Sequence, residues 1–280
     1  MKIAVMSDST SYMPDEWIER YNIHIVPLSV VFGDESCREG IDITTERFYQ
    51  EVKEAKDLPK TSQPSIGMIT EKLEELAREY DAVISVHLSS GISGTYQAVA
   101  SAGEMVEGID VYPYDSELSC MAQGFYVAEA AKLAEAGETP EPIIQRLDVM
   151  KKSMRAYFMV DDLSHLQRGG RLNGAQALVG SLLQVKPVLH FVDKQIVPFE
   201  KIRTRKKALN RIMGMLEEDA EKGGKLKVAF IHANDEAAAV RLKDTFDAAH
   251  PNMDTMVSYF GPVIGTHLGE GAVGVCWYQE

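Results

Sequence analysis

Short apolar runs and segments of helical period alternate along the first half of the chain. Residues 2–6, 82–88 and 109–114 have the composition of buried strands, and residues 23–32 are rich in β-formers. Apolar positions repeat at helical spacing in the segments between them. The expected helices cover residues 14–21, 44–55, 66–80, 96–106, 120–136 and 142–153. Because strands that alternate with helices are typical of a doubly wound parallel sheet, we predict an α/β fold for this half.

The second half of the chain alternates less regularly. Expected strands cover residues 156–160, 185–192, 196–199, 225–232, 255–260 and 273–278, with a turn at Asp193-Lys194. Expected helical segments cover residues 161–167, 176–183, 206–220 and 236–248. Strands and helices mixed in this way predict an α+β domain. The predicted domains are therefore residues 1–155 and residues 156–280.

Composition narrows the functional classes. The chain has 280 residues, of which 45% are hydrophobic and 25% charged, as in an ordinary globular protein. Its net charge of −13 opposes binding to nucleic acids. No apolar run is long enough for a signal peptide or a membrane span. The widely spaced Cys37, Cys120 and Cys276 form no disulfide or metal pattern, so we expect a cytoplasmic protein without a metal cofactor.

Two polar segments could form an anion-binding site, but an ordinary turn or helix end explains each of them as well. Residues 61–65 offer several hydroxyls, and a turn with Ser65 as a helix N-cap accounts for them as well. Residues 163–171 contain arginines, whose forked side chains bind anions. A helix that ends at Gly169, with the arginines in solvent, fits that segment equally well. Neither segment identifies a site by itself.

Residues 89–96 lie between an expected strand and an expected helix. Proteins with open α/β sheets bind ligands in such loops, and the free N–H groups at a helix start attract anions. Gly91 and Gly94 beside Ser93 favour close approach of a ligand, although an ordinary N-cap is an equal alternative. Thr95 stands where the nucleophile elbow Gly-x-Ser-x-Gly requires its second glycine, so we exclude that motif.

A glycine-rich segment covers residues 261–274. Its end matches the dinucleotide fingerprint G-x-G-x-x-G, but residues 275–278 have a strand pattern where the fingerprint requires a helix. We therefore expect a loop that wraps a small group, with His267 as a hydrogen-bond donor to an anion. An ordinary surface histidine is the alternative. The sequence contains no P-loop motif, so ATP is not an expected ligand of this chain.

In this order, the segments resemble the DegV family, whose members include the fatty-acid-binding subunits of bacterial fatty acid kinase. Each motif is short, but the ordered set is specific and extends from near the first residue to near the last. The matching motifs are Ser7-Asp8-Ser9-Thr10, Thr61-Ser62-Gln63-Pro64-Ser65, Ser90-Gly91-Ile92-Ser93-Gly94-Thr95-Tyr96, Arg168-Gly169-Gly170-Arg171 and Gly265-Thr266-His267.

The resemblance implies that a long-chain fatty acid, similar to palmitate or oleate, is buried in an acyl tunnel between the two domains. It implies that Thr61, Ser93 and His267 hydrogen-bond the carboxylate, and that Arg171 lies near the exposed head group. In the family, a separate ATP-dependent kinase subunit phosphorylates this carboxylate. The resemblance therefore implies a lipid carrier and not an enzyme.

Elementary energetics agree with such a carrier. Each buried CH₂ contributes about 0.8 kcal/mol, so a long acyl chain supplies on the order of 10 kcal/mol before the entropic cost of binding. The carboxylate must be hydrogen-bonded, because an unpaired buried charge is costly. The sequence departs from the family pattern at Leu268 and Glu270, and the Glu270 carboxylate would repel the ligand if it faced the head group.

Two other functions are compatible with the same residues. An acyl ester hydrolase would use Ser93 as the nucleophile and His267 as the base, although no acidic third residue can be assigned. A stand-alone lipid sensor or buffer would need no kinase. Transient contact with a membrane surface is compatible with each lipid-binding function.

A basic run at residues 201–207 stands out in an acidic chain. Thr204 is the expected N-cap of the following helix, so Arg205 and Lys206 lie in its first turn, where cations oppose the helix dipole. We expect Arg203, Arg205 and Lys206 to dock the kinase by charge complementarity. A solvated helix start is the alternative.

Overall fold

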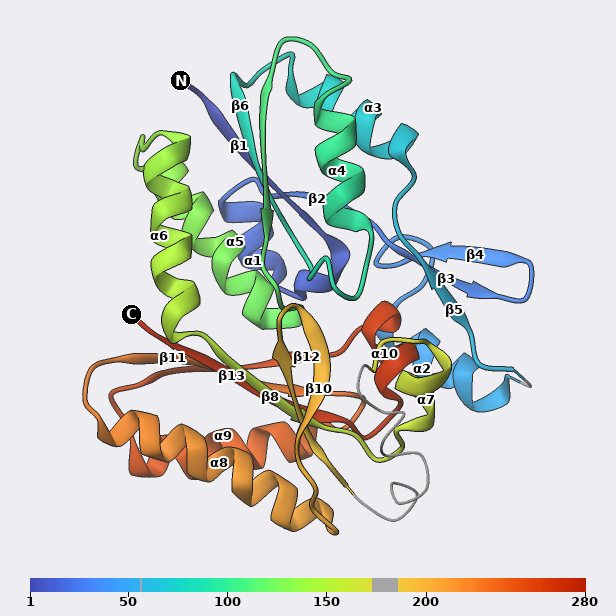
Figure 1. Cartoon of the computed structure of the whole chain (residues 1–280), viewed down its shortest axis with the longest axis vertical. Helices are drawn as coiled ribbons and strands as arrows, with labels where there is room; N and C mark the ends of the chain where they lie inside the picture. The colour runs from blue at the N-terminus through green and yellow to red at the C-terminus, as the bar shows by residue number, and fades with distance from the viewer. Residues whose placement is uncertain (56, 173–185) are drawn as a thin grey trace.

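The N-terminal part of the chain is built on a four-stranded parallel sheet. The computed structural model describes residues 1–55, 57–172 and 186–280. The strand order is β2-β1-β6-β7, and every neighbouring pair is parallel. This arrangement confirms the parallel sheet predicted for this half of the chain (Figure 1). The strands are β1 (Ile3–Asp8), β2 (His24–Val26), β6 (Ala82–His87) and β7 (Asp110–Asp115).

Helices cover both faces of the parallel sheet. α3 and α4 pack together on one face, and α5 packs on the other. Thr44 and the predicted cap Ser65 start their helices by accepting hydrogen bonds from the N–H groups of Arg47 and Met68. The elements are the 3-10 turn η1 (Ser9–Ser11), α1 (Asp15–Arg20), α2 (Thr45–Glu54), α3 (Ile66–Leu76), α4 (Thr95–Gly103), α5 (Cys120–Glu135) and α6 (Pro140–Ser153).

The C-terminal part forms a six-stranded mixed sheet of order β10-β9-β8-β13-β11-β12. β11 and β12 run parallel, whereas the other neighbouring pairs run antiparallel. This mixture confirms the α+β character predicted for this half, and α8 and α9 cover one face of the sheet (Figure 1). The elements are β8 (Arg155–Met159), β9 (Val188–Val192), β10 (Gln195–Glu200), α8 (Arg205–Glu221), β11 (Leu226–His232), α9 (Glu236–Ala249), β12 (Asp254–Tyr259) and β13 (Val273–Gln279).

Helix α5 lies between the two large sheets and joins them. It contacts β1 and β6 of the parallel sheet and β11 and β13 of the mixed sheet. Every residue from Cys120 to Ala128 is buried, as expected of a helix that is apolar on all sides. The largest apolar cluster therefore contains residues from both sheets. The division into domains 1–155 and 156–280 stays a prediction, although β8 begins at Arg155.

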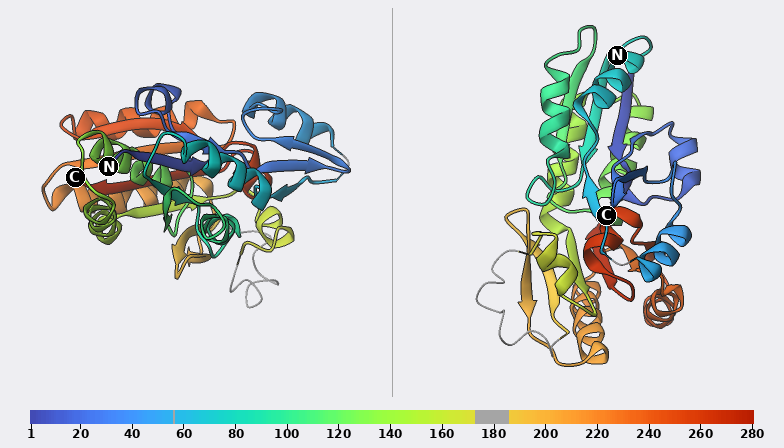
Figure 2. Two further views of the ribbon diagram at one scale, coloured as in Figure 1. Left: turned by 90° about the horizontal axis from the view of Figure 1, so that it is seen from above. Right: turned by 90° about the vertical axis from the view of Figure 1, so that its right-hand side faces the viewer.

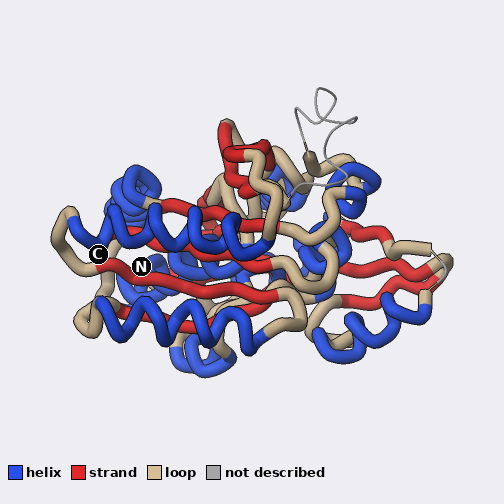
Figure 3. Tube along the Cα trace, turned by 90° about the horizontal axis from the view of Figure 1, so that it is seen from below, coloured by secondary structure: helices blue, strands red, loops and turns tan. Residues whose placement is uncertain are grey.

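A third, antiparallel sheet lies at one end of the molecule, apart from the two large sheets (Figures 2 and 3). Its order is β4-β3-β5, formed by β3 (Ser29–Phe32), β4 (Glu35–Arg38) and β5 (Lys60–Ser62). The turn predicted at residues 61–65 was wrong for Thr61 and Ser62, because Lys60–Ser62 pairs with β3. A three-residue strand is too short to produce a periodic pattern in the sequence.

The glycine-rich segment at residues 261–274 is not the predicted loop. Its first half forms α10 (Pro262–Leu268), with Pro262 at the start of the helix, where a missing N–H group costs nothing. Glycine lowers helix propensity, but packing of α10 on α2 and α7 (Ser164–Arg168) overrides that preference. α7 ends at the predicted cap Gly169. The helix predicted at residues 176–183 lies outside the described residues.

A fully buried hydrogen-bond network joins the ends of β1 and β6. The Asp8 carboxylate accepts hydrogen bonds from the Thr10 N–H and hydroxyl groups, at 3.0 and 2.6 Å, and from the Leu88 N–H group at 3.0 Å. Its second oxygen also accepts from His87 Nδ1 at 3.0 Å, and His87 Nε2 lies 2.5 Å from Ser85 Oγ. Burial alone would raise the pKa of Asp8, but these hydrogen bonds outweigh burial and lower it. Asp8 of the Ser-Asp-Ser-Thr motif is therefore a structural residue.

We predict that Asp8→Ala lowers the free energy of unfolding by on the order of 3 kcal/mol or more, because it leaves several buried donors without an acceptor. Urea unfolding followed by circular dichroism measures this loss. Asp15→Ala, at an exposed position at the start of α1, is the control and should change stability little. A loss below about 1 kcal/mol for Asp8→Ala would show that the network is dispensable.

Candidate functional site

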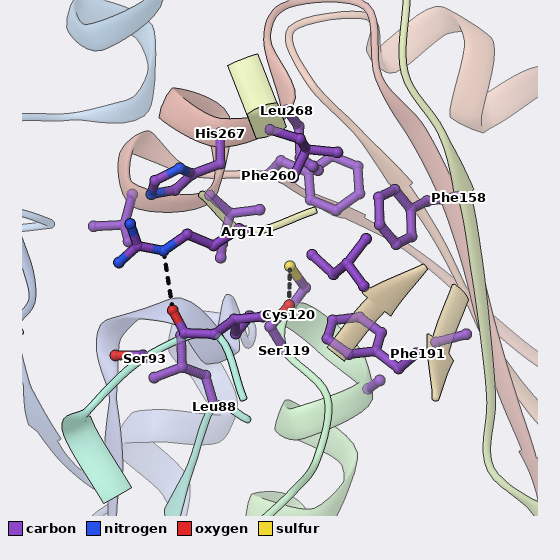
Figure 4. A pocket seen from close by; sticks show the side chains of 18 of the residues that line it. Leu88, Ser93, Ser119, Cys120, Phe158, Arg171, Phe191, Phe260, His267 and Leu268 are labelled. Atoms are coloured by element: carbon purple, nitrogen blue, oxygen red, sulfur yellow. Dashed lines mark hydrogen bonds between the residues drawn. The ribbon is translucent and has the colours of Figure 1, made fainter. Parts of the chain in front are cut away.

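An apolar cavity of about 310 Å³ is bounded by the mixed sheet and by the loop between β6 and α4. Its walls come from β8, β9, β10, β11 and β13, from the start of α5 and from α10 (Figure 4). None of its described lining residues is acidic. The volume is in the range of small-molecule sites, and the lining suits an apolar group. The larger apolar side chains include Leu88, Phe158, Phe191, Ile231, Phe260 and Leu268.

Thr61, Ser93, His267 and Arg171 line the polar end of this cavity. Thr61 is on β5, His267 is on α10, Ser93 is in the loop before α4, and Arg171 follows α7. The Thr61 Oγ1 and His267 Nε2 atoms are 2.8 Å apart. The structure therefore brings together the four residues that the family resemblance assigned to the head group. Their role as a carboxylate site stays a prediction.

The His267 ring is neutral at pH 7. Burial lowers the pKa of His267 to about 4, and the positive charge of Arg171 acts in the same direction. Nδ1 has no hydrogen-bond partner among the described residues. Nε2 lies within hydrogen-bond distance of Thr61 Oγ1, and the tautomer of the ring decides which of the two atoms donates.

Gly169 of the Arg-Gly-Gly-Arg motif is required by the position of His267. A Cβ atom at residue 169 would collide with His267 Nδ1. The end of α7 can therefore approach the imidazole closely only because residue 169 has no side chain. His165, one turn earlier in α7, lies with Nδ1 3.4 Å from the Thr266 carbonyl oxygen, which is a long contact. The two short helices α7 and α10 thus fix the ring together.

Ser93 lies at the start of α4. Its Oγ accepts a hydrogen bond from the Thr95 N–H group at 3.3 Å and lies 2.9 Å from Thr95 Oγ1. A serine hydroxyl and the N–H groups at the start of a nine-residue helix are therefore found together at the polar end of the cavity. Such an arrangement favours a negatively charged group.

Arg171 connects the cavity with a second, open cleft. Arg171 Nε donates to the Ile92 carbonyl oxygen at 3.1 Å, and Nη1 donates to the Gly169 carbonyl oxygen at 2.5 Å. Thr61, Arg171 and His267 line both spaces, so the cleft adjoins the polar end of the cavity. Basic groups outnumber acidic ones in the cleft. Its ionisable side chains are Asp57, Lys60, His165, Arg168, Arg171 and His267.

Glu39 supports the site, although no motif in the sequence indicated it. Its carboxylate accepts hydrogen bonds from the Val263 N–H group at 2.8 Å and the Tyr12 hydroxyl at 2.8 Å. The Ile264 N–H group donates to the Tyr12 hydroxyl at 3.3 Å. Burial raises the pKa of Glu39 to about 7. Glu39 and Tyr12 thus cap α10, the helix that carries His267, from a distant part of the chain.

Glu270 and the two residues of the hydrolase alternative, Ser93 and His267, each contact other side chains of the chain. Glu270 is not part of the cavity lining and pairs with Lys53 at 2.8 Å and with Asn234 at 2.7 Å, so it does not face the head-group site. For a hydrolase, Ser93 would have to face His267. Instead His267 Nε2 contacts Thr61, and Ser93 contacts Thr95, so these contacts give the hydrolase no support.

Part of the positive charge in the basic run before α8 is paired with acidic side chains of the same chain. Thr204 is the predicted N-cap and accepts a hydrogen bond from the Lys207 N–H group. Arg205 forms ion pairs of 2.9 Å with both Asp161 and Asp235. Both acids are distant in sequence from Arg205, so no local pattern indicates these ion pairs. Arg203 and Lys206 are exposed, and the docking role of Arg203, Arg205 and Lys206 stays a prediction.

Two cysteine side chains, Cys120 and Cys276, lie in the cavity wall. Burial raises the pKa of Cys120 and of Cys276, so both thiols are protonated and act as apolar lining. Within the described ranges, no three histidine, cysteine, aspartate or glutamate side chains gather as metal ligands. In the same part of the chain, no helix is long and apolar enough to cross a membrane.

The chain is similar to known proteins along nearly its whole length. A family model described as "uncharacterised protein, DegV family" matches residues 2–280. Protein DegV of Bacillus subtilis is 58% identical over 278 residues, which cover 99% of this chain and 99% of that protein. A crystal structure of DegV from Bacillus subtilis, described as a fatty acid binding protein, has a TM-score of 0.96, 58% identity and full coverage of both chains. The DegV family protein of Thermus thermophilus, whose structure is described by its fatty acid binding, has a TM-score of 0.92 and 31% identity, with full coverage of both chains.

The neutral state of His267 predicts a pH dependence. Its pKa of about 4 in the folded chain lies below the ordinary value of about 6.5. The stability that results is fully present above pH 6.5 and is lost as the pH falls towards 4, because the unfolded state binds the proton first. Urea unfolding of the ligand-free protein should therefore show wild type losing about 1.5 kcal/mol relative to His267→Gln between about pH 6.5 and 5. A constant difference across that range would mean that the folded imidazole titrates normally.

Proposed function

Because the chain belongs to the DegV family, we propose that it binds one long-chain fatty acid non-covalently. The acyl chain occupies the apolar cavity, and Thr61, Ser93 and His267 hydrogen-bond the carboxylate at the polar end. One observation carries this proposal: the cavity is apolar along most of its lining and ends at hydrogen-bonding groups without an acid among them. The DegV proteins of Bacillus subtilis and Thermus thermophilus, described as binding fatty acids, support it.

The two ends of the ligand make different contributions. Burial of the acyl chain supplies the affinity, at about 0.8 kcal/mol for each CH₂ group. The carboxylate supplies orientation, because it must keep its hydrogen bonds when it leaves water. His267 is neutral, so the positive charge near the carboxylate comes from Arg171, assisted by the N–H groups at the start of α4.

We further propose that the chain is a carrier that offers the carboxylate to a separate ATP-dependent kinase through the second cleft. A carboxylate oxygen attacks the γ-phosphorus of ATP bound by the kinase, and ADP leaves, which yields an acyl phosphate. Lys60, Arg168 and Arg171 line the cleft and offset the charge of the phosphate group. Free, buried Cys37, Cys120 and Cys276 accord with a reducing cytoplasm. Transient contact with a membrane surface would give the carrier access to its lipid.

We predict that purified protein contains near one fatty acid per chain. Thr61→Ala, Ser93→Ala and His267→Ala should each weaken oleate binding by about 1–3 kcal/mol, because each removes one hydrogen bond to a buried carboxylate. Mass spectrometry of extracted lipid and equilibrium binding of oleate measure the two effects.

The control for these variants is Thr70→Ala, a change on α3 outside the cavity lining, which should bind oleate like wild type. Normal binding by all three head-group variants would place the carboxylate elsewhere. Absence of extracted lipid, together with no binding of added palmitate or oleate, would reject the carrier function.

The exposed part of the basic run gives a separate prediction for the kinase. Reversing the charge of Arg203 and Lys206 together should slow acyl-phosphate formation about tenfold at low salt and leave oleate binding unchanged. Arg205 is excluded from the test, because its reversal would break two ion pairs within the chain.

The matched control reverses Lys132 and Lys152, two exposed lysines on α5 and α6. This control changes the net charge by the same amount as the reversal of Arg203 and Lys206, but on the surface of α5 and α6. Equal slowing by both pairs would indicate a net-charge effect, and no slowing by either would remove the basic run from the docking surface. A stand-alone sensor or buffer would bind oleate but support no acyl-phosphate formation with any cognate kinase.

A further inference from the structure

The β9–β10 hairpin reaches from the mixed sheet to the loop before α4. Figure 1 shows it rising beside α5 towards the parallel sheet. β10 is the edge strand, so β9 is its neighbour within the sheet. The two-residue tip is Asp193-Lys194, and both residues have positive φ angles, of 47° and 69°. Aspartate tolerates such a backbone better than lysine does, so the contacts of the tip help to hold Lys194 in place.

The inner face of the hairpin closes the cavity. Phe191 of β9 and Ile196 of β10 both line it. Ile196 is buried, and Leu172, directly after the head-group residue Arg171, forms a β-bridge with it. Displacement of the hairpin would therefore expose the acyl chain along one side.

Three contacts fasten the tip to the N-terminal part of the chain. The Ser89 hydroxyl donates to the Lys194 carbonyl oxygen at 2.6 Å. Lys194 Nζ lies 3.0 Å from the Asp115 carboxylate, whose side chain is only 9% exposed. The Ser90 hydroxyl and N–H groups also donate to Asp115, at 2.6 and 3.2 Å. Finally, Gly91 packs so closely that a Cβ atom there would collide with the Lys194 carbonyl oxygen.

The loop that receives the tip also belongs to the head-group site. Ser89 and Gly91 contact Lys194, the Ile92 carbonyl oxygen accepts from Arg171, and Ser93 lines the polar end of the cavity. Consecutive residues of one loop thus link the hairpin to the carboxylate site. Gly91, which the sequence suggested for close approach of a ligand, instead permits close approach of the hairpin.

We propose that the β9–β10 hairpin is a lid on the acyl cavity and that the contacts of Lys194 with Ser89, Gly91 and Asp115 form a latch that sets the rate of fatty-acid exchange. This inference rests on the proposed fatty-acid binding. Because the latch contacts break when the hairpin moves but do not touch the ligand, weakening them speeds both entry and release. Loss of a head-group hydrogen bond speeds release alone.

The test uses the full chain loaded with radiolabelled oleate. The release rate is measured by transfer of oleate to excess albumin. The dissociation constant is measured by partition of oleate between the protein and phosphatidylcholine vesicles. The association rate constant is the release rate constant divided by the dissociation constant. Lys194→Gln should raise the release rate about two- to five-fold, as expected for a partly exposed ion pair. Gly91→Ala should raise it about tenfold, because the methyl group pushes the tip away. For both variants the dissociation constant should change less than the release rate.

Lys225→Gln is the matched control, since it removes an exposed ion pair to Glu280 at 2.8 Å, outside the cavity lining. Its release rate should equal that of wild type. Thr61→Ala should raise the release rate without raising the association rate. Wild-type release should also speed up in about 1 M salt, and that of Lys194→Gln should not.

The outcome that overturns the lid differs from the one that overturns binding. Unchanged release from Lys194→Gln and from folded Gly91→Ala, with oleate still bound, would overturn the lid while leaving fatty-acid binding intact. If Gly91→Ala does not fold, the result for Lys194→Gln decides alone. Failure of wild type to bind oleate would reject the proposed function, and the lid would be rejected with it.

Discussion

A carboxylate joined to a long apolar chain can be buried only where an apolar cavity ends at hydrogen-bond donors. Under the proposed function, the arrangement of the cavity follows from that constraint. The mixed sheet, the start of α5 and α10 provide the apolar walls, while the polar groups come from β5, the start of α4, the segment after α7 and the last turn of α10. Of these places, the start of α4 also presents free backbone N–H groups, whereas the last turn of a helix leaves carbonyl groups free.

Meeting that constraint requires parts of the chain that are far apart in sequence. Thr61 and His267 form their contact across 206 positions, and Glu39 caps the helix of His267 across 224. The cap matters because α10 is short and its own N-cap, Gly261, has no side chain to donate or accept. The position of the imidazole is therefore set by the N-terminal part of the chain as much as by the helix that carries it.

The sequence predicts the elements with strong periodicity and misses those fixed by tertiary contacts. The parallel strands, most helices and the caps Ser65 and Thr204 follow from local patterns. β5 and α10 do not, because one is very short and the other contains glycine. The residues of the polar cavity end came from family resemblance, since no local pattern joins Thr61 to His267. The ion pairs of Arg205 were equally invisible, because Asp161 and Asp235 lie in distant parts of the chain.

The central position of α5 limits how a ligand can enter. This helix packs on both large sheets, and the largest apolar cluster extends through it from one sheet to the other. Separating the two halves as rigid bodies would expose that whole surface, at about 25 cal/mol for each Å². A two-stranded edge hairpin exposes far less when it moves, and local opening of this kind costs only part of the global stability. Under the proposed function, ligand exchange would therefore favour movement at the sheet edge over separation of the sheets.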